Sequence, residues 1–220
     1  MKEIIQLESF HRKESVLFFK NFVNPNVSVT CMVDASKCFR LAKSHDEKFF
    51  HHYLYAILKA ANKIKELHYR FSSDGQIVYY DKLDVLAPIR IPGHYSFATL
   101  RFPYASDRAQ FISSVNDIIR NADSLSSYGI EEGLQENDVI LVSALPDLQF
   151  TSISYTQKHD RGNDYPLINV GKMGEDGKMP LGICVNHSFV DGEHLSQFYK
   201  LVQQYLDEDN IYFNSGVQKM

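Results

Sequence analysis

The spacing of apolar positions along the chain predicts three amphipathic helices. From Asp46 to about His68, apolar residues recur every three or four positions, which predicts the longest helix with Asp46 at its start. The same period, with polar residues between, is found over 107–122 and over about 193–206. A shorter helix is expected just after Asp34, because aspartate often caps the first turn of a helix.

Shorter apolar stretches between these helices predict strands. They alternate between apolar and polar residues, or are rich in β-branched and aromatic side chains. Turn-forming residues at 72–76 and at 175–177 predict two hairpins. The expected strands are 27–33, 67–71, 77–80, 84–91 and 95–102 on either side of Pro92 and Gly93, one strand on each side of Pro146 within 137–155, and the two arms of a hairpin over 167–185.

This mixture of strands and helices predicts the fold class. An α/β (α+β) two-layer sandwich is expected, in which a mixed β-sheet is flanked by helices. No internal repeat or low-complexity linker is visible, which predicts a single domain. The sequence contains neither G-x-G-x-x-G nor G-x-x-x-x-G-K-[ST], so neither familiar phosphate-binding loop is expected.

Composition and charge narrow the class of protein further. The chain has 220 residues, of which 44% are hydrophobic and 23% charged, as in ordinary globular domains. A net charge of −4 gives no reason to expect nucleic acid or an anionic membrane surface as a partner. Cys31, Cys38 and Cys184 are scattered and form no metal-binding spacing. With no signal-peptide pattern and no long apolar run, we expect a cytoplasmic protein without a metal.

The segment VNHSFVDGEHL, residues 185–195, holds the strongest candidate for chemistry. His187 ends an apolar run and is followed by Asp191, Gly192 and a predicted helix. A largely neutral imidazole can accept a proton, so His187 could be a general base whose turn is held by Asp191 and Gly192. A glycine there would permit a positive φ or a close approach of the helix to other backbone. An ordinary turn histidine is an equally good interpretation of these residues alone.

Other reactive residues have simpler interpretations. Cys184 lies on an extended strand, where alternation points it away from the face of His187, so a small buried hydrophobe is expected. His51 and His52 are adjacent on a helix and diverge by about 100°. No cysteine or carboxylate completes a metal site with them, and we interpret them as a solvated helix end.

Four stretches together resemble one family. NHSFVDGEHL, from residue 186, resembles the HHxxxDG signature of the chloramphenicol acetyltransferases. FHRKESVLFF at 10–19, FPYASD at 102–107 and VSALPDLQFTSIS at 142–154 are similar to three further segments of that family, in the same order. The resemblance extends to about residue 206 and implies a chloramphenicol acetyltransferase-like domain over 1–206, with 207–220 as a C-terminal tail.

The resemblance implies a reaction and an assembly. His187 would take the proton from a substrate hydroxyl, which attacks acetyl-CoA directly, without a covalent enzyme intermediate or a metal. Ser143 would donate to the tetrahedral oxyanion, although a serine in this position alone is more often bonded to backbone. The protein would be a homotrimer with its active sites between subunits, and chloramphenicol would be the acceptor.

The resemblance also assigns supporting residues. Asp191 would pair with a cation from the N-terminal segment rather than form a triad with His187. The matching position holds Lys13, where the family has arginine, and Arg12 beside it is the alternative partner. A lysine cannot form a two-pronged contact with a carboxylate, so the support would be looser with Lys13.

The acceptor and CoA sites follow in the same way. Phe18, Phe19 and Asn169 would line the acceptor pocket, and Lys172 would contact a CoA phosphate. A lysine in solvent at the end of a hairpin arm is an equally good interpretation of Lys172. Asn186 replaces the first histidine of the signature. Phe19 stands where the family has tyrosine, and Asn169 where it has threonine. These departures, with those at Lys13 and Asn186, leave open a ligand-binding member of the fold that has lost catalysis. A CoA-dependent acyltransferase for a different hydroxyl acceptor is a second alternative.

Overall fold

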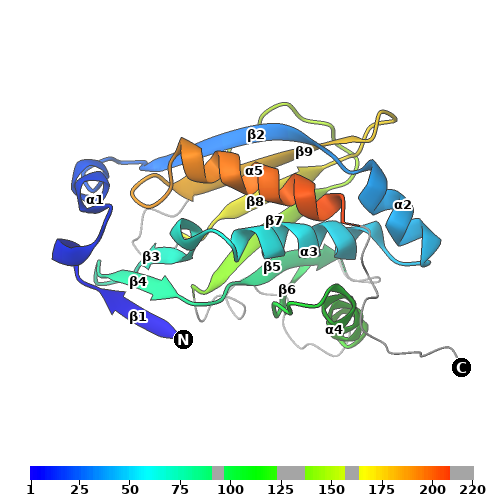
Figure 1. Ribbon diagram of the computed structural model, residues 1–220, viewed down its shortest axis with the longest axis horizontal. Coiled ribbons are helices and arrows are strands. Elements are labelled where there is room, and N and C mark those ends of the chain that lie inside the picture. The colour runs from blue at the N-terminus through cyan, green and yellow to red at the C-terminus, as the bar shows by residue number, and fades with distance from the viewer. Residues whose placement is uncertain (91–96, 123–136, 157–163, 209–220) are drawn as a thin grey trace, which may run out of the picture.

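A mixed β-sheet forms one layer of the molecule. The structure is a computed structural model that describes residues 1–90, 97–122, 137–156 and 164–208. Within these residues, six strands pair in the order β2-β9-β8-β7-β5-β6, with β5–β7 and β7–β8 parallel and the other pairs antiparallel (Figure 1). Their bounds are β2 Asn26–Asp34, β5 Asp84–Arg90, β6 Phe97–Phe102, β7 Val139–Leu145, β8 Leu167–Gly171 and β9 Lys178–Asn186.

Helices form the second layer. α3 (Phe49–Ala61) and α5 (Gly192–Leu206) lie side by side across one face of the sheet, with α2 (Ser36–Ser44) at its end and α4 (Arg108–Arg120) below (Figure 1). The apolar positions of α5 face the sheet, and all five of its buried residues have the spacing that predicted the helix: Leu195, Phe198, Val202, Tyr205 and Leu206. The predicted two-layer fold class is confirmed.

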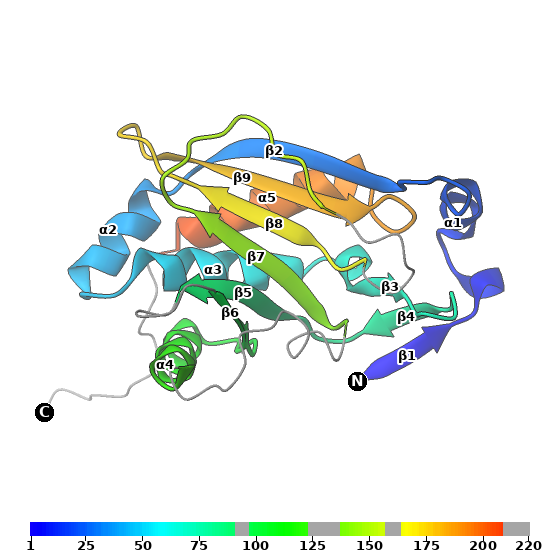
Figure 2. The ribbon, with the colours of Figure 1, turned by 180° about the vertical axis from the view of Figure 1, so that it is seen from behind.

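A smaller antiparallel sheet extends the body at one end. β1 (Lys2–Ile5), β4 (Ile77–Tyr80) and β3 (Tyr69–Phe71) pair in that order, and β3 and β4 form the hairpin predicted from residues 72–76. The short helix η1 (Leu7–Ser9) and α1 (Lys13–Phe19) connect this sheet to β2, while η2 (Lys65–His68) precedes β3. As a result, α1 lies next to the end of β9 (Figure 2).

The second strand predicted after Pro146 is wrong. β7 ends at Leu145, and the residues that follow cross the face of β8 and β9 that the helices leave uncovered, without forming a strand. They cross so closely that a Cβ added at Gly182 would stand 2.7 Å from the Tyr155 hydroxyl and 2.8 Å from Ile153. A glycine in β9 therefore admits a covering segment, and that segment explains why β9 is buried along nearly its whole length.

The longest helix is shorter than predicted. α3 begins at Phe49 and not at Asp46, whose φ of 55° is in the left-handed region and incompatible with a helical turn. The chain leaves the helix after Ala61 and forms η2 separately. Ile64 is nevertheless buried, which explains why its spacing extended the helical pattern. At the other predicted cap, Asp34 ends β2 and its carboxylate accepts from the Ser36 amide, while Ala35 stands at the N-cap of α2.

The interpretation of His51 and His52 as a solvated helix end is wrong. Their exposed fractions are 1% and 0%, because α3 is covered by the sheet on one side and by α2, α4 and α5 on others. Burial lowers the pKa of His51 to about 4 and also lowers that of His52, even though the Glu47 carboxylate lies 2.7 Å from the His52 ring. Both side chains are core groups.

Two expectations fall on residues outside the described ranges. The break at Pro92 and Gly93 between β5 and β6 is one, and the tail from residue 209 onward is the other. No helix in the described ranges is both long and apolar enough to span a membrane.

Candidate active site

His187 lies in the turn between β9 and α5. Its amide donates to the carbonyl of Pro25 at 2.8 Å, which ties the turn to the start of β2. The amides of Phe189 and Val190 both donate to the Asn186 carbonyl at 3.1 Å. The turn is therefore fixed at both sides by backbone hydrogen bonds, as expected for a segment that must hold a side chain in one orientation.

Asn186 stabilises this turn with its side chain. The amide oxygen accepts from the Ser188 backbone N–H at 2.9 Å, and the residue is 7% exposed. This is the local bond that asparagine side chains commonly make two residues ahead. The residue that departs from the family signature thus has a structural role of its own here.

The imidazole of His187 is held in a defined tautomer. Its Nδ1 lies 2.8 Å from the carbonyl oxygen of Val190, and because a carbonyl can only accept, Nδ1 carries the proton. In the neutral ring, Nε2 therefore keeps a free lone pair, which a general base requires. The ring of Phe19 stacks on the imidazole with centroids 4.5 Å apart and an angle of 24° between the planes.

An aromatic cluster on and beside α1 surrounds the stacked pair. Phe18 and Phe22 pack against Phe19 with ring centroids 4.9 and 5.2 Å away. Phe18 is 64% exposed, so its ring is turned outward while Phe19 faces His187. Of the two phenylalanines expected at the acceptor pocket, the structure brings Phe19 to His187 and leaves Phe18 at the surface of the same cluster.

Asp191 stabilises the turn and the start of α5. Its side chain caps the helix by accepting from the Glu193 amide at 3.0 Å, and its other oxygen contacts Arg12 Nη1 at 2.8 Å. Partial burial would raise the pKa of Asp191, but Arg12 and His194 hold it below its ordinary value. The carboxylate is therefore engaged by a cation and by helix amides, an arrangement unlike a Ser-His-Asp triad.

Arg12, and not Lys13, is the partner of Asp191. Arg12 precedes α1 and its side chain is largely buried, with an exposed fraction of 14%. Its Nε also lies 3.5 Å from the carbonyl of Ser188, so one guanidinium contacts two residues of the turn that holds His187. The cation that pairs with Asp191 is therefore Arg12, one position before Lys13, to which the resemblance assigned this role.

This assignment predicts different effects for two neighbouring substitutions. Arg12→Ala should lower the free energy of unfolding by about 1–2 kcal/mol, because it leaves a partly buried carboxylate without its cation. Lys13→Ala should change it by less than about 0.5 kcal/mol, as for most surface positions. Urea unfolding of both variants measures this, and equal losses would contradict the assignment.

Gly192 does not have the local role predicted for it. It is the first residue of α5, and the described glycines with positive φ are Gly75 and Gly177. A Cβ added at Gly192 would meet no atom of the described residues within 4 Å. Neither a left-handed turn nor a close approach within the chain therefore accounts for this glycine.

His194 is a residue at this turn that the sequence analysis missed. It occupies the third position of α5, and its Nδ1 accepts from the Asp191 amide at 3.1 Å, completing a reciprocal capping box with Asp191. The signal was available, because a capping residue followed three positions later by a side chain that can accept marks a helix start. Glutamate or glutamine is usual there, and a histidine is easily overlooked.

Ser143 and Asn169 lie together, but far from His187. They are register partners on β7 and β8, and both are half-buried on the face opposite the buried Val142. Asn169 in turn pairs with Gly182 on β9, and His187, directly after the end of β9, comes five positions after Gly182. At about 3.3 Å per residue this is an offset of about 16 Å along the strand direction, and Ser143 also lies two strands across from β9, so the two groups are at least that far apart. Figure 2 shows the arrowheads of β7 and β9 at opposite ends of the sheet.

Lys172 belongs to the end of the sheet that holds Ser143. It directly follows β8 and is exposed, and its amide donates to the Leu148 carbonyl at 2.7 Å. The predicted site residues thus form two groups within one chain. His187, Phe19, Arg12 and Asp191 stand at one end, and Ser143, Asn169 and Lys172 at the other.

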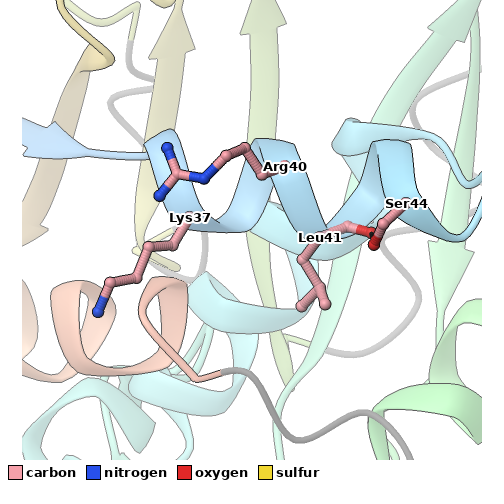
Figure 3. A pocket seen from close by; sticks show the side chains of 4 residues that line it. All are labelled: Lys37, Arg40, Leu41 and Ser44. Carbon is pink, nitrogen blue, oxygen red and sulfur yellow. Dashed lines mark hydrogen bonds between the residues drawn. The ribbon is translucent and has the colours of Figure 1, made fainter.

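A surface pocket of about 340 Å³ lies elsewhere, on α2. Lys37, Arg40, Leu41 and Ser44 line it, all from that one helix (Figure 3). It includes no residue of either group. Within the described ranges, no cluster of three or more His, Cys, Asp or Glu side chains could hold a metal ion.

Most of the chain is similar to proteins of one family. A model of the chloramphenicol acetyltransferase family matches residues 2–203. The chain belongs to the chloramphenicol acetyltransferase family. Chloramphenicol acetyltransferases of Proteus mirabilis and Staphylococcus aureus are 28% and 25% identical to this chain, and the alignments cover 93% and 94% of it and 94% and 96% of those proteins.

Solved structures place the chain in the same family. A chloramphenicol acetyltransferase shares 43% identity with a TM-score of 0.84, covering 94% of this chain and 100% of that one. A dihydrolipoamide acetyltransferase of Azotobacter vinelandii has the same fold at 16% identity, with a TM-score of 0.63. The resemblance inferred from four short segments is confirmed, and with it the prediction of an acyltransferase.

Proposed function

We propose that the protein transfers the acetyl group of acetyl-CoA to a hydroxyl of chloramphenicol, with His187 as the general base. The observation that carries the proposal is the contact between His187 Nδ1 and the Val190 carbonyl, which leaves Nε2 free to accept a proton. The activity named for the relatives that match nearly the whole chain supports the same reaction. Acetyl-CoA is a co-substrate, and no step requires a metal.

The reaction proceeds in a ternary complex. His187 Nε2 removes the proton of the acceptor hydroxyl as its oxygen attacks the thioester carbonyl carbon. The resulting tetrahedral oxyanion accepts a hydrogen bond from the Ser143 hydroxyl. When the carbon–sulfur bond breaks, the imidazolium returns its proton to the leaving thiolate, so the products are the acetyl ester and CoA. No covalent enzyme intermediate forms.

The two groups of site residues are joined by assembly. Because strand register puts Ser143 at least about 16 Å from His187 within one chain, we infer that a second copy supplies one of them. A homotrimer with active sites between subunits satisfies this. Exposed apolar side chains next to both groups support the contact, since Phe18 is 64% exposed beside His187 and Leu148 is 57% exposed beside Lys172.

Substrate contacts divide between the two subunits. Phe18 and Phe19 of the His187 subunit provide an apolar wall for the acceptor, and Asn169 of the neighbour contributes a polar group next to Ser143. Lys172, which is exposed, would contact a phosphate of CoA. The open space around Gly192 leaves room for a neighbouring subunit or a substrate there.

The domain and the compartment belong to the same proposal. One domain spans residues 1–206, with 207–220 as a tail, because a single buried cluster includes side chains from Phe10 to Leu206. Cys31, Cys38 and Cys184 form no disulfide, which suits a reducing cytoplasm.

Release of CoA thiol tests the function directly. Purified protein with acetyl-CoA should release thiol rapidly only when chloramphenicol is added, and the product should be its mono-acetyl ester by mass spectrometry. Release with other hydroxyl compounds but not with chloramphenicol would assign a different acceptor. Chloramphenicol binding without release would show a member of the fold that has lost catalysis, and either outcome overturns the proposal as stated.

A further inference from the structure

The peptide group between Val190 and Asp191 connects two histidines. Its carbonyl oxygen accepts from His187 Nδ1 at 2.8 Å. Its N–H donates to His194 Nδ1 at 3.1 Å. Hydrogen bonds at the two ends of one amide strengthen each other, because donation by the N–H makes the carbonyl a better acceptor. His194 is therefore coupled to the tautomer of His187 through a single planar group.

His194 can hold this peptide only in one protonation state. Its Nδ1 lies close to two partners, the Asp191 amide at 3.1 Å and the Asp191 Oδ1 at 2.8 Å. A neutral ring with a lone pair on Nδ1 accepts from the amide. A protonated ring must instead donate Nδ1–H to the carboxylate, and the amide then loses its acceptor.

Charged and titratable groups from three other parts of the chain lie around the His194 ring. Glu66 of η2 places Oε2 3.7 Å from His194 Nε2, and its other oxygen lies 3.5 Å from His11 Nε2. Arg12 contacts the second oxygen of Asp191, so this carboxylate lies between the guanidinium and the His194 ring. His194 and Glu66 are only 17% and 18% exposed, so solvent screens these charges little.

We propose that His194 is a positioning residue for His187, acting through the Val190–Asp191 peptide and only in its neutral form. The inference rests on the proposed role of His187 as the base. It adds a second histidine that must be unprotonated for full activity, without contact to substrate. Acid then removes activity by two routes, protonation of His187 itself and release of the peptide that sets its tautomer.

Two substitutions of His194 separate these roles from helix capping. His194→Gln keeps an acceptor for the Asp191 amide, since glutamine is usual at this position of a capping box, but it cannot titrate. It should keep kcat within about threefold. On the acid side of its pH profile, the slope of log kcat against pH should be smaller than in the wild type by one proton. His194→Leu removes the acceptor and should lower kcat about tenfold, with KM for both substrates changed less than about twofold.

Ser196→Ala is the matched control. Ser196 is exposed on the same first turns of α5 and donates to the Gly192 carbonyl, so its loss perturbs the helix start but not the Val190–Asp191 peptide. It should leave both kcat and its pH profile unchanged. If the control lowers kcat as much as His194→Leu, or if His194→Gln keeps the wild-type acid limb, the inference is wrong.

A spectroscopic measurement tests the inference even if the acceptor is misassigned. In protein labelled with ¹⁵N-histidine, the His187 signals, identified by their absence in His187→Ala, should show a proton on Nδ1 in the wild type and in His194→Gln. In His194→Leu the Nε2-protonated form should appear. An unchanged His187 tautomer in His194→Leu would overturn the coupling, whereas absence of acetyl transfer in the wild type would count only against the proposed function.

Discussion

His187→Ala should lower kcat for acetyl transfer by about 10²–10⁴-fold, the contribution of a positioned general base. The substitution removes the nitrogen that accepts the hydroxyl proton, while the turn keeps its backbone bonds to Pro25 and Asn186. Because the proposed contacts to the acceptor and CoA are made by other residues, KM for either substrate should change much less than kcat. Steady-state thiol release, with each substrate varied in turn while the other is saturating, measures both quantities.

A histidine away from the site provides the control for this substitution. His45, exposed at the end of α2, can be changed to alanine with kcat expected to stay within about twofold, as for most surface positions. The thermal midpoint of His187→Ala should remain within a few degrees of the wild type. A His187→Ala protein that folds and keeps more than about a tenth of wild-type kcat would exclude His187 as the base.

Local patterns were sufficient to predict most of the fold. The apolar residues of β9 before His187 and those of α5 each form an uninterrupted pattern in the sequence. In both elements the spacing of the apolar residues puts them on a face that the fold buries. The same holds for the hairpins, whose turn residues adjoin the strands they connect. Where a pattern and its packing partner lie close in sequence, the sequence contains the needed information.

The wrong predictions of the fold arise where contacts between residues far apart in the sequence determine the local structure. The chain after Pro146 has a strand-like composition but crosses over glycines of β8 and β9, a contact that only the tertiary structure creates. His51 and His52 look solvated by residue type, yet three other helices cover α3. Asp46 is an ordinary capping residue whose left-handed φ follows from the bend between α2 and α3.

The candidate site was predicted only in part, for a related reason. The motif around His187 identified the candidate base, but the choice between Arg12 and Lys13 depends on the direction in which the chain enters α1. The hydrogen bond that fixes the tautomer comes from a backbone carbonyl, which no residue type reveals. The separation of Ser143 from His187 follows from strand register, which depends in part on the pairing of β7 with β8, segments more than twenty residues apart in the sequence.

Ser143→Ala should lower kcat by about 10²–10³-fold, corresponding to about 2.7–4 kcal/mol of lost oxyanion stabilisation. The side chain is half-buried on β7, and alanine leaves the strand pairing with β8 intact, so the folded protein should be as stable as the wild type within about 1 kcal/mol. A ratio of kcat values near one in a well-folded variant would show that Ser143 is an ordinary strand serine.

Co-assembly of the two inactive variants then decides whether the site lies between subunits. In a trimer formed from equal amounts of Ser143→Ala and His187→Ala chains, a site is intact when the first kind of chain supplies His187 and the second supplies Ser143. Random assembly produces about one intact site in four, so about a quarter of wild-type activity should return. If both residues served one site within a single chain, no such site could form and the mixture would stay at the sum of its parents. The 16 Å implied by the strand register predicts the first result.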